Sequence, residues 1–178
     1  MDFFIWLEDT AVSTWVREST SLLAFPFILY LHTLGLALIA GLSSAVALAI
    51  IVLRERAPYS SLAKLFPYMW IGFAINVLSG IALLIAYPAK ALTNPVFYIK
   101  MIAIAIAVGI LLWLQGHFVR GSFAPAATVH DEHPTTLSRA TFRRAAWSLL
   151  GLWLIATVAG RMLAYTYSIL MATLASFT

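Results

Sequence analysis

Apolar residues are concentrated in four long runs along the chain, and short polar breaks separate them. These runs predict membrane-spanning helices at residues 22–53, 66–87, 95–117 and 145–177. Each has at least the roughly 20 residues that an α-helix needs to cross a hydrocarbon core about 30 Å thick. We therefore predict an all-α, polytopic membrane protein in which four transmembrane helices form an up-down bundle.

The composition supports this reading and limits the chemistry. With 62% hydrophobic and 10% charged residues, a water-soluble fold would leave too much apolar surface in water. Four spans and their connections occupy nearly all 178 residues, so we expect residues 1–178 to form a single domain. The chain has no cysteine, which excludes disulfides, iron–sulfur clusters and thiolate metal sites.

The basic residues predict the orientation in the membrane. If the N-terminus lies outside, the outer ends of the spans carry only Arg17 and Lys90 as basic residues. The inner ends carry a much larger set: Arg54, Arg56, Lys64, Arg120, Arg139, Arg143 and Arg144. By the positive-inside rule, both termini are predicted to be periplasmic in a multi-pass protein of the bacterial inner (cytoplasmic) membrane. The net charge of +4 thus reflects topology, and no nucleic-acid partner is expected.

The segments outside the spans carry three further predictions. Residues 1–21 mix bulky apolar groups with charges near helical spacing, which predicts an amphipathic helix in the membrane interface, as an outer anchor or as a lid over a site. The Asn94-Pro95 dipeptide is expected to start the third span. Residues 119–142, rich in Gly, Ser, Pro, Ala and Thr, are predicted to form a cytoplasmic loop.

Three ionisable side chains lie inside the apolar runs, where a bilayer makes them costly: His32, Lys100 and Arg161. Counted from the inner ends of their helices at about 1.5 Å per residue, they lie roughly 31, 22 and 24 Å from the inner face. All three are therefore expected in one layer near the outer face. This layer is the predicted binding site.

Other residues of interest share that layer: Gly35, Asn76, Gly80 and Tyr165. Glycine beside an intramembrane polar group permits the close approach of another helix or of a flat ligand. No acidic residue lies inside any predicted span. The two cations would then pair with lipid headgroups, with acids of the N-terminal segment (Glu8, Asp9 and Glu18), or with a bound anion such as a haem propionate, a phosphate or a carboxylate substrate.

His32 is either a hydrogen-bonded packing residue or a metal ligand, in particular an axial ligand of a b-type haem. His117 lies about 30 Å away along the membrane normal, so it cannot complete a bis-histidine pair with His32 in one subunit. The remaining arrangements are a His/Met pair with Met101 or Met162, a five-coordinate haem, or two His32 residues across a dimer axis.

Motifs of soluble enzyme chemistry are absent. The sequence contains no GxGxxG, Walker A, GxSxG or HExxH motif. The segment His130-Asp131-Glu132-His133 resembles a metal site only superficially, because Pro134 follows at once and no second ligand cluster exists. We do not expect the chain to be an enzyme on its own.

Four segments carry a resemblance to known membrane proteins: FPFILYLHTLGLALIAG, FPYMWIGFAINVLSGIALLIAYP, TNPVFYIKMIAIAIAV and RRAAWSLLGLWLIATVAGRMLAY. With them the chain resembles a group of small four-helix bacterial inner-membrane proteins. It is also distantly similar to the CopD-like membrane proteins, which are linked to copper handling and have helical cores like those of b-type cytochromes. The resemblance implies that His32, Lys100 and the Gly160-Arg161 pair belong to a recurring site.

Three functions are compatible with these observations. The first is a small redox-associated subunit that binds a b-type haem, or a quinone or lipid, near the periplasmic face. The second is a non-catalytic accessory or assembly subunit of a larger membrane complex. The third is a metal or anion transporter, for which four helices would need to form a homo-oligomer in the lipid bilayer.

Overall fold

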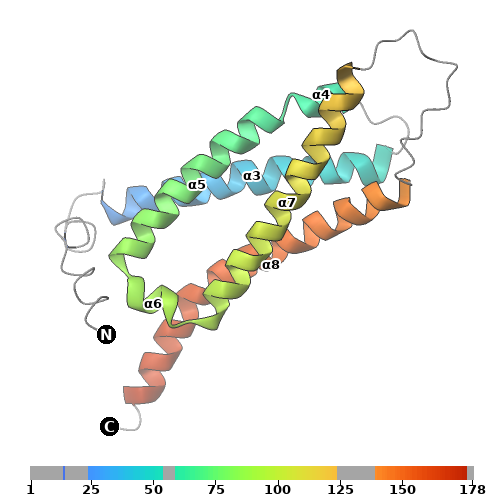
Figure 1. The fold of residues 1–178 in the computed structure, drawn as a ribbon. Coiled ribbons are helices and arrows are strands. Elements are labelled where there is room, and N and C mark those ends of the chain that lie inside the picture. Colours follow the sequence, from blue (N-terminus) through green and yellow to red (C-terminus); the bar gives the residue numbers. More distant parts are fainter. Residues whose placement is uncertain (1–13, 15–23, 54–58, 124–138, 176–178) are drawn as a thin grey trace, which may run out of the picture.

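The computed structural model describes residues 14, 24–53, 59–123 and 139–175. In this part of the chain the fold is all-α, as predicted, and four helices are long and apolar enough to cross a membrane. The long helices alternate in direction and form an up-down bundle (Figure 1). The helices are α3 (Phe25–Leu53), α4 (Tyr59–Ala63), α5 (Phe66–Ala86), α6 (Pro88–Leu92), α7 (Pro95–Phe123) and α8 (Arg139–Ala175). The amphipathic helix predicted for residues 1–21 lies outside the described residues apart from residue 14.

Two helices are longer than the apolar runs that predicted them. Helix α7 continues to Phe123, beyond the predicted end at residue 117, and α8 begins at Arg139 instead of residue 145. Both ends of the predicted loop 119–142 are therefore helical. The reason is that an apolar run marks depth in the membrane, whereas helical hydrogen bonding continues beyond that depth through residues that favour helix, such as arginine and alanine.

The short helices mark the two ends of the bundle, which we call the α4 end and the α6 end. At the α6 end the rings of Phe25 and Tyr87 meet edge to face, with centroids 5.8 Å apart. The Asn94 side chain accepts a hydrogen bond from the Val96 backbone N–H at 3.0 Å. This N-terminal cap starts α7 directly before Pro95, as the sequence predicted.

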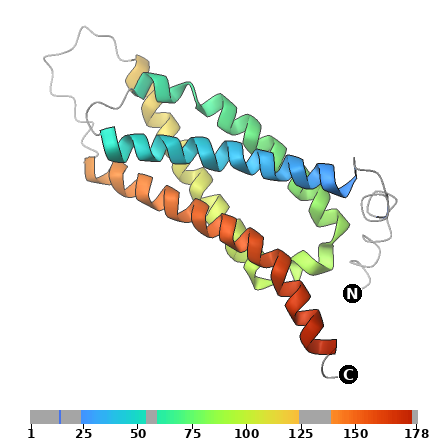
Figure 2. The ribbon, with the colours of Figure 1, turned by 180° about the vertical axis from the view of Figure 1, so that it is seen from behind.

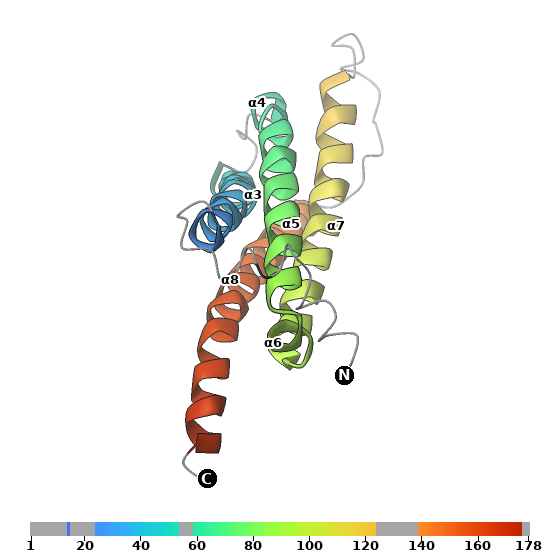
Figure 3. The ribbon, with the colours of Figure 1, turned by 90° about the vertical axis from the view of Figure 1, so that its left-hand side faces the viewer.

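The four long helices do not pack equally closely. Helix α3 packs along α5 and α8, and α7 packs along α8. Helices α5 and α7 instead meet through long side chains near the α4 end. There the Phe66 and Phe118 rings lie 5.8 Å apart, and the Trp70 indole donates to the Gln115 side chain at 2.8 Å. In the view from behind, α3 and α8 lie side by side in front of α7 (Figure 2). Viewed from the side, α3 lies apart from α7 (Figure 3).

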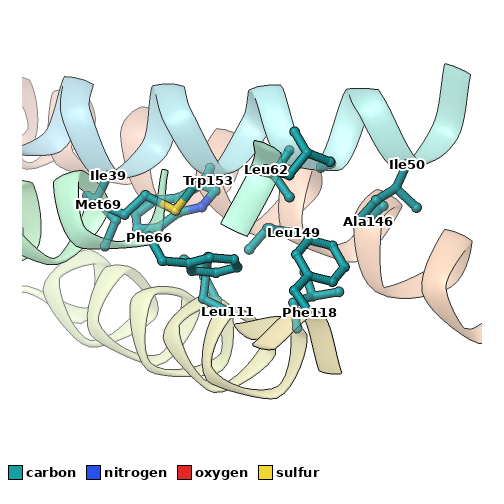
Figure 4. Packing of buried hydrophobic residues seen from close by; sticks show 14 of the residues in the cluster. Ile39, Ile50, Leu62, Phe66, Met69, Leu111, Phe118, Ala146, Leu149 and Trp153 are labelled. Carbon is teal, nitrogen blue, oxygen red and sulfur yellow. The ribbon is translucent and has the colours of Figure 1, made fainter. Parts of the chain in front are cut away.

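A hydrophobic core fills the bundle from its middle to the α4 end. All four long helices and α4 contribute to it (Figure 4). The largest side chains with almost no exposed surface include Ile39, Phe66, Met69, Leu111 and Leu149. The buried residues nearer the α6 end, among them Asn76, Ser79 and Ala159, are smaller or more polar, and the predicted layer lies among them.

Candidate functional site

His32 is held by α5 through two reciprocal hydrogen bonds. Its Nδ1 lies 3.1 Å from the backbone carbonyl oxygen of Asn76. In return, the Asn76 amide donates from Nδ2 to the backbone carbonyl of His32 at 2.8 Å. The Ser79 hydroxyl lies 3.2 Å from Nδ1. Asn76 and Ser79 are both buried, so the network is protected from lipid.

These contacts indicate which ring nitrogen of His32 carries the proton. A backbone carbonyl can only accept a hydrogen bond, so Nδ1 must be the donor to Asn76. The Ser79 hydroxyl donates to the carbonyl of Ile75 at 2.6 Å, which leaves its lone pairs to face Nδ1. In the neutral ring, Nε2 then holds the lone pair, and no described residue forms a hydrogen bond with it.

Lys100 lies in the same layer from the opposite side of the bundle. A methyl group placed on Gly160 of α8 would lie 3.8 Å from both Cε and Nζ of Lys100, so the lysine stem passes over this glycine. The Lys100 charge also acts on the His32 ring. No acidic side chain is available nearby among the described residues, because all seven acidic residues fall outside them. Lys100 is thus a half-buried cation in the same layer as His32, without an acidic partner among the described residues.

The glycines of the layer have different neighbours. A side chain on Gly35 would come within 2.6 Å of the Asn76 backbone nitrogen and 2.8 Å of the Gly72 carbonyl. Gly35 therefore lets the α3 and α5 backbones touch, which is the helix-packing alternative. A side chain on Gly80 would instead lie 3.1 Å from Cε1 of His32. Gly80 leaves room for the ring.

The structure brings together some of the predicted site residues and leaves others outside the bundle. One level of the bundle holds His32, Asn76, Gly80 and Lys100. Gly35 lies about one helical turn nearer the α4 end, where α3 and α5 touch. Arg161 and Tyr165 are exposed on the surface of α8. Lys100 and Arg161 therefore do not face the interior together, because positions 160 and 161 of a helix point about 100° apart.

The two methionines considered as axial ligands also lie on the outside. Met101 is 47% exposed and Met162 is 50% exposed. The buried Met69 is seven residues from Asn76 on α5, about 10 Å along the helix. Within the described residues, His32 is therefore the only histidine or methionine of this layer that faces the interior of the bundle.

His117 belongs to the α4 end, as the sequence predicted. Its Nδ1 lies 2.8 Å from the carbonyl of Trp113, and its ring packs against those of Trp113 and Phe142. No group of three or more metal-ligating side chains occurs among the residues that the structure describes. The segment His130-Asp131-Glu132-His133 lies outside those residues.

Two features of the interior were not predicted. The first is Ser79, whose hydroxyl completes the contacts of His32 Nδ1 at 3.2 Å. Its spacing of three from Asn76, which puts both on one helix face, was the available signal. The second feature is Trp153, 3% exposed, whose indole N–H has no hydrogen-bond partner among the described residues. Nothing in the sequence distinguished it from other membrane tryptophans.

Comparisons with protein families, with characterised proteins and with solved structures found no match to this chain.

Proposed function

We propose that this protein is a small membrane subunit that binds a redox group, a b-type haem or a quinone, in the layer formed by His32, Asn76, Gly80 and Lys100. The observation that carries the proposal is the state of His32. Its Nδ1 faces a backbone carbonyl, which leaves the Nε2 lone pair for a ligand. A metal-binding histidine usually has its other nitrogen held in this way. By the predicted orientation, the layer lies near the periplasmic face.

The donor set fits a haem in part. His32 would supply one axial nitrogen, and the Lys100 ammonium would pair with a propionate. Since Met101 and Met162 are exposed, the described residues supply one axial ligand per subunit. The haem version of the proposal is therefore five-coordinate, or has two His32 side chains meeting across a dimer axis.

The same residues also fit a quinone. Lys100 would donate to a quinone carbonyl oxygen, and the His32 Nε2 lone pair would accept from a quinol hydroxyl. The chain has no cysteine and hence no thiol or iron–sulfur redox chemistry of its own, so either group would supply the electron transfer. The protein's own part is to orient the ligand, to hold its negative charge and to limit access from lipid.

The test is the absorption spectrum of the purified protein, with mass spectrometry of its solvent extract. We expect either a Soret band or a co-extracted quinone. His32→Ala should remove the ligand, and His117→Ala, a matched change at the other end of the bundle, should retain it. Size-exclusion chromatography of both variants separates loss of ligand from loss of fold.

The proposal is wrong if wild-type protein, produced with adequate iron and haem, contains neither group. Retention of the ligand by a folded His32→Ala variant would equally contradict it. Copurification of a larger complex without any redox group would support the accessory-subunit alternative.

A further inference from the structure

A groove on the surface of the bundle lies between α7 and α8, away from the His32 layer. Its volume is about 500 Å³, and it lies between the middle of α7 and the first turns of α8. The residues that line it are Ile106, Gly109, Ile110 and Trp113 of α7, and Thr141, Arg144, Ala145 and Ser148 of α8. We propose that this groove binds one anionic phospholipid.

The lining changes character along the groove. The α7 wall is apolar, and a side chain placed on Gly109 would meet no atom within 4 Å, so the glycine leaves the groove open. The α8 wall carries the hydroxyls of Thr141 and Ser148 and the guanidinium of Arg144. This combination matches a lipid, with an acyl chain beside Gly109 and a phosphate beside Arg144.

The position of Arg144 suits a headgroup. The candidate span of α8 is Ala140–Leu163, so Arg144 lies in its first turns, where a long arginine side chain can reach the membrane interface. A guanidinium pairs with phosphate through two parallel hydrogen bonds. No carboxylate among the described residues competes for it, since all seven acids lie elsewhere in the chain.

Charge decides between lipid classes. Arg143 is exposed beside Arg144, so the α4 end of α8 carries two neighbouring cations at the membrane surface. Basic residues near a bilayer surface attract anionic lipids. An anionic headgroup is therefore favoured over a zwitterionic one. This inference is independent of the proposed redox function, which concerns the other end of the bundle.

The experiment compares two lipids with identical acyl chains. Purified protein is mixed with micelles containing dioleoyl phosphatidylglycerol or dioleoyl phosphatidylcholine, and retained lipid is counted by native mass spectrometry. We expect one phosphatidylglycerol per chain and at least about tenfold weaker retention of phosphatidylcholine. Equal retention of the two lipids by wild-type protein overturns the proposal, whatever the variants do.

Matched variants locate the site. Arg144→Gln and Gly109→Leu should each lower phosphatidylglycerol retention about tenfold, the effect expected for a lost charge-assisted hydrogen bond or a filled groove. Arg143→Gln and Gly151→Leu are the controls, because Arg143 does not line the groove and Gly151 is equally open but lies elsewhere on α8. Both controls should bind as wild type, and Arg144→Lys should restore part of the retention.

Two results would overturn the location. One is an equal loss of lipid in Arg143→Gln and Arg144→Gln, which would indicate a diffuse surface charge. The other is a dimer that retains no phosphatidylglycerol and becomes monomeric in Gly109→Leu, which would make the groove a contact between two copies of the chain.

Discussion

His32 on α3 and Asn76 on α5 exchange hydrogen bonds in both directions. The imidazole Nδ1 faces the Asn76 carbonyl at 3.1 Å, and the Asn76 amide donates to the His32 carbonyl at 2.8 Å. This pair fixes the register of two neighbouring helices and orients the imidazole at the same time. Stability and the proposed ligand binding would therefore depend on one contact.

Removing the Asn76 side-chain amide tests how much the His32–Asn76 contact stabilises the fold. Asn76→Ala deletes the bond to the His32 carbonyl but leaves the Asn76 backbone carbonyl in place. We expect the free energy of unfolding to fall by about 1–2 kcal/mol, the usual cost of a lost buried hydrogen bond. Thermal unfolding in micelles followed by circular dichroism measures it. Val77→Ala, at an exposed neighbouring position, is the control, and an equal loss there would refute the role of the amide.

The close contact of α3 and α5 requires glycine at position 35. In Gly35→Ala the new methyl would lie 2.6 Å from the Asn76 backbone nitrogen, so the helices must separate. We expect a loss of roughly 1–3 kcal/mol, as for other overpacked interiors. Gly41→Ala has nothing within 4 Å and should instead be neutral or stabilising by up to about 1 kcal/mol. Similar melting temperatures for both variants would contradict this account.

Lys100 should lower the stability of the ligand-free protein and strengthen the binding of the proposed redox group. Lys100→Met removes a half-buried cation that has no described acidic partner and keeps the length of the stem over Gly160. We expect the ligand-free variant to be at least as stable as wild type and its retention of the redox group to be much weaker. Arg161→Met, on the exposed side of α8, should alter retention far less. Ligand content and melting temperature, measured on the same samples, decide the matter.

Trp153 carries a buried indole N–H that has no hydrogen-bond partner among the described residues. Trp153→Phe removes this donor and keeps most of the ring, so its effect on stability should lie within about 1 kcal/mol of zero. Trp153→Ala should cost about 3–5 kcal/mol, because the cavity cannot close. A large loss in Trp153→Phe would show that the indole N–H has a partner, such as a buried water or ligand. Chemical denaturation of both variants provides the comparison.

The predicted orientation can be tested without purification. Reporters fused before residue 1 and after residue 178 should both be active in the periplasm, and a tag inserted near His130 should be accessible only from the cytoplasm. A cytoplasmic C-terminus would contradict the orientation or the number of spans.

The sequence predicted the fold well because the bilayer imposes a simple length and polarity requirement on each span. The helical rise, which converts residue counts into depth, also predicted that His32 and Lys100 share a level. The sequence could not tell that Arg161 faces outward while Gly160 faces Lys100. That difference depends on the rotation of α8 about its own axis, and the packing of α8 against α7 determines this rotation. For the same reason Gly35 was grouped with the binding residues although it contacts the α5 backbone.

The position of Lys100 has an electrical consequence. Lys100 is five residues from Pro95, the first residue of α7, which places it about 7 Å inside the α6 end, roughly a quarter of the 30 Å hydrocarbon core. A charge crossing the whole core exchanges about 2.3 kcal/mol per 100 mV, so an anion that reaches Lys100 from the periplasm exchanges about 0.6 kcal/mol. With the predicted orientation, each 100 mV of inside-negative membrane potential would lower the affinity for a monovalent anion about threefold. Occupancy would then rise as an energised membrane is discharged.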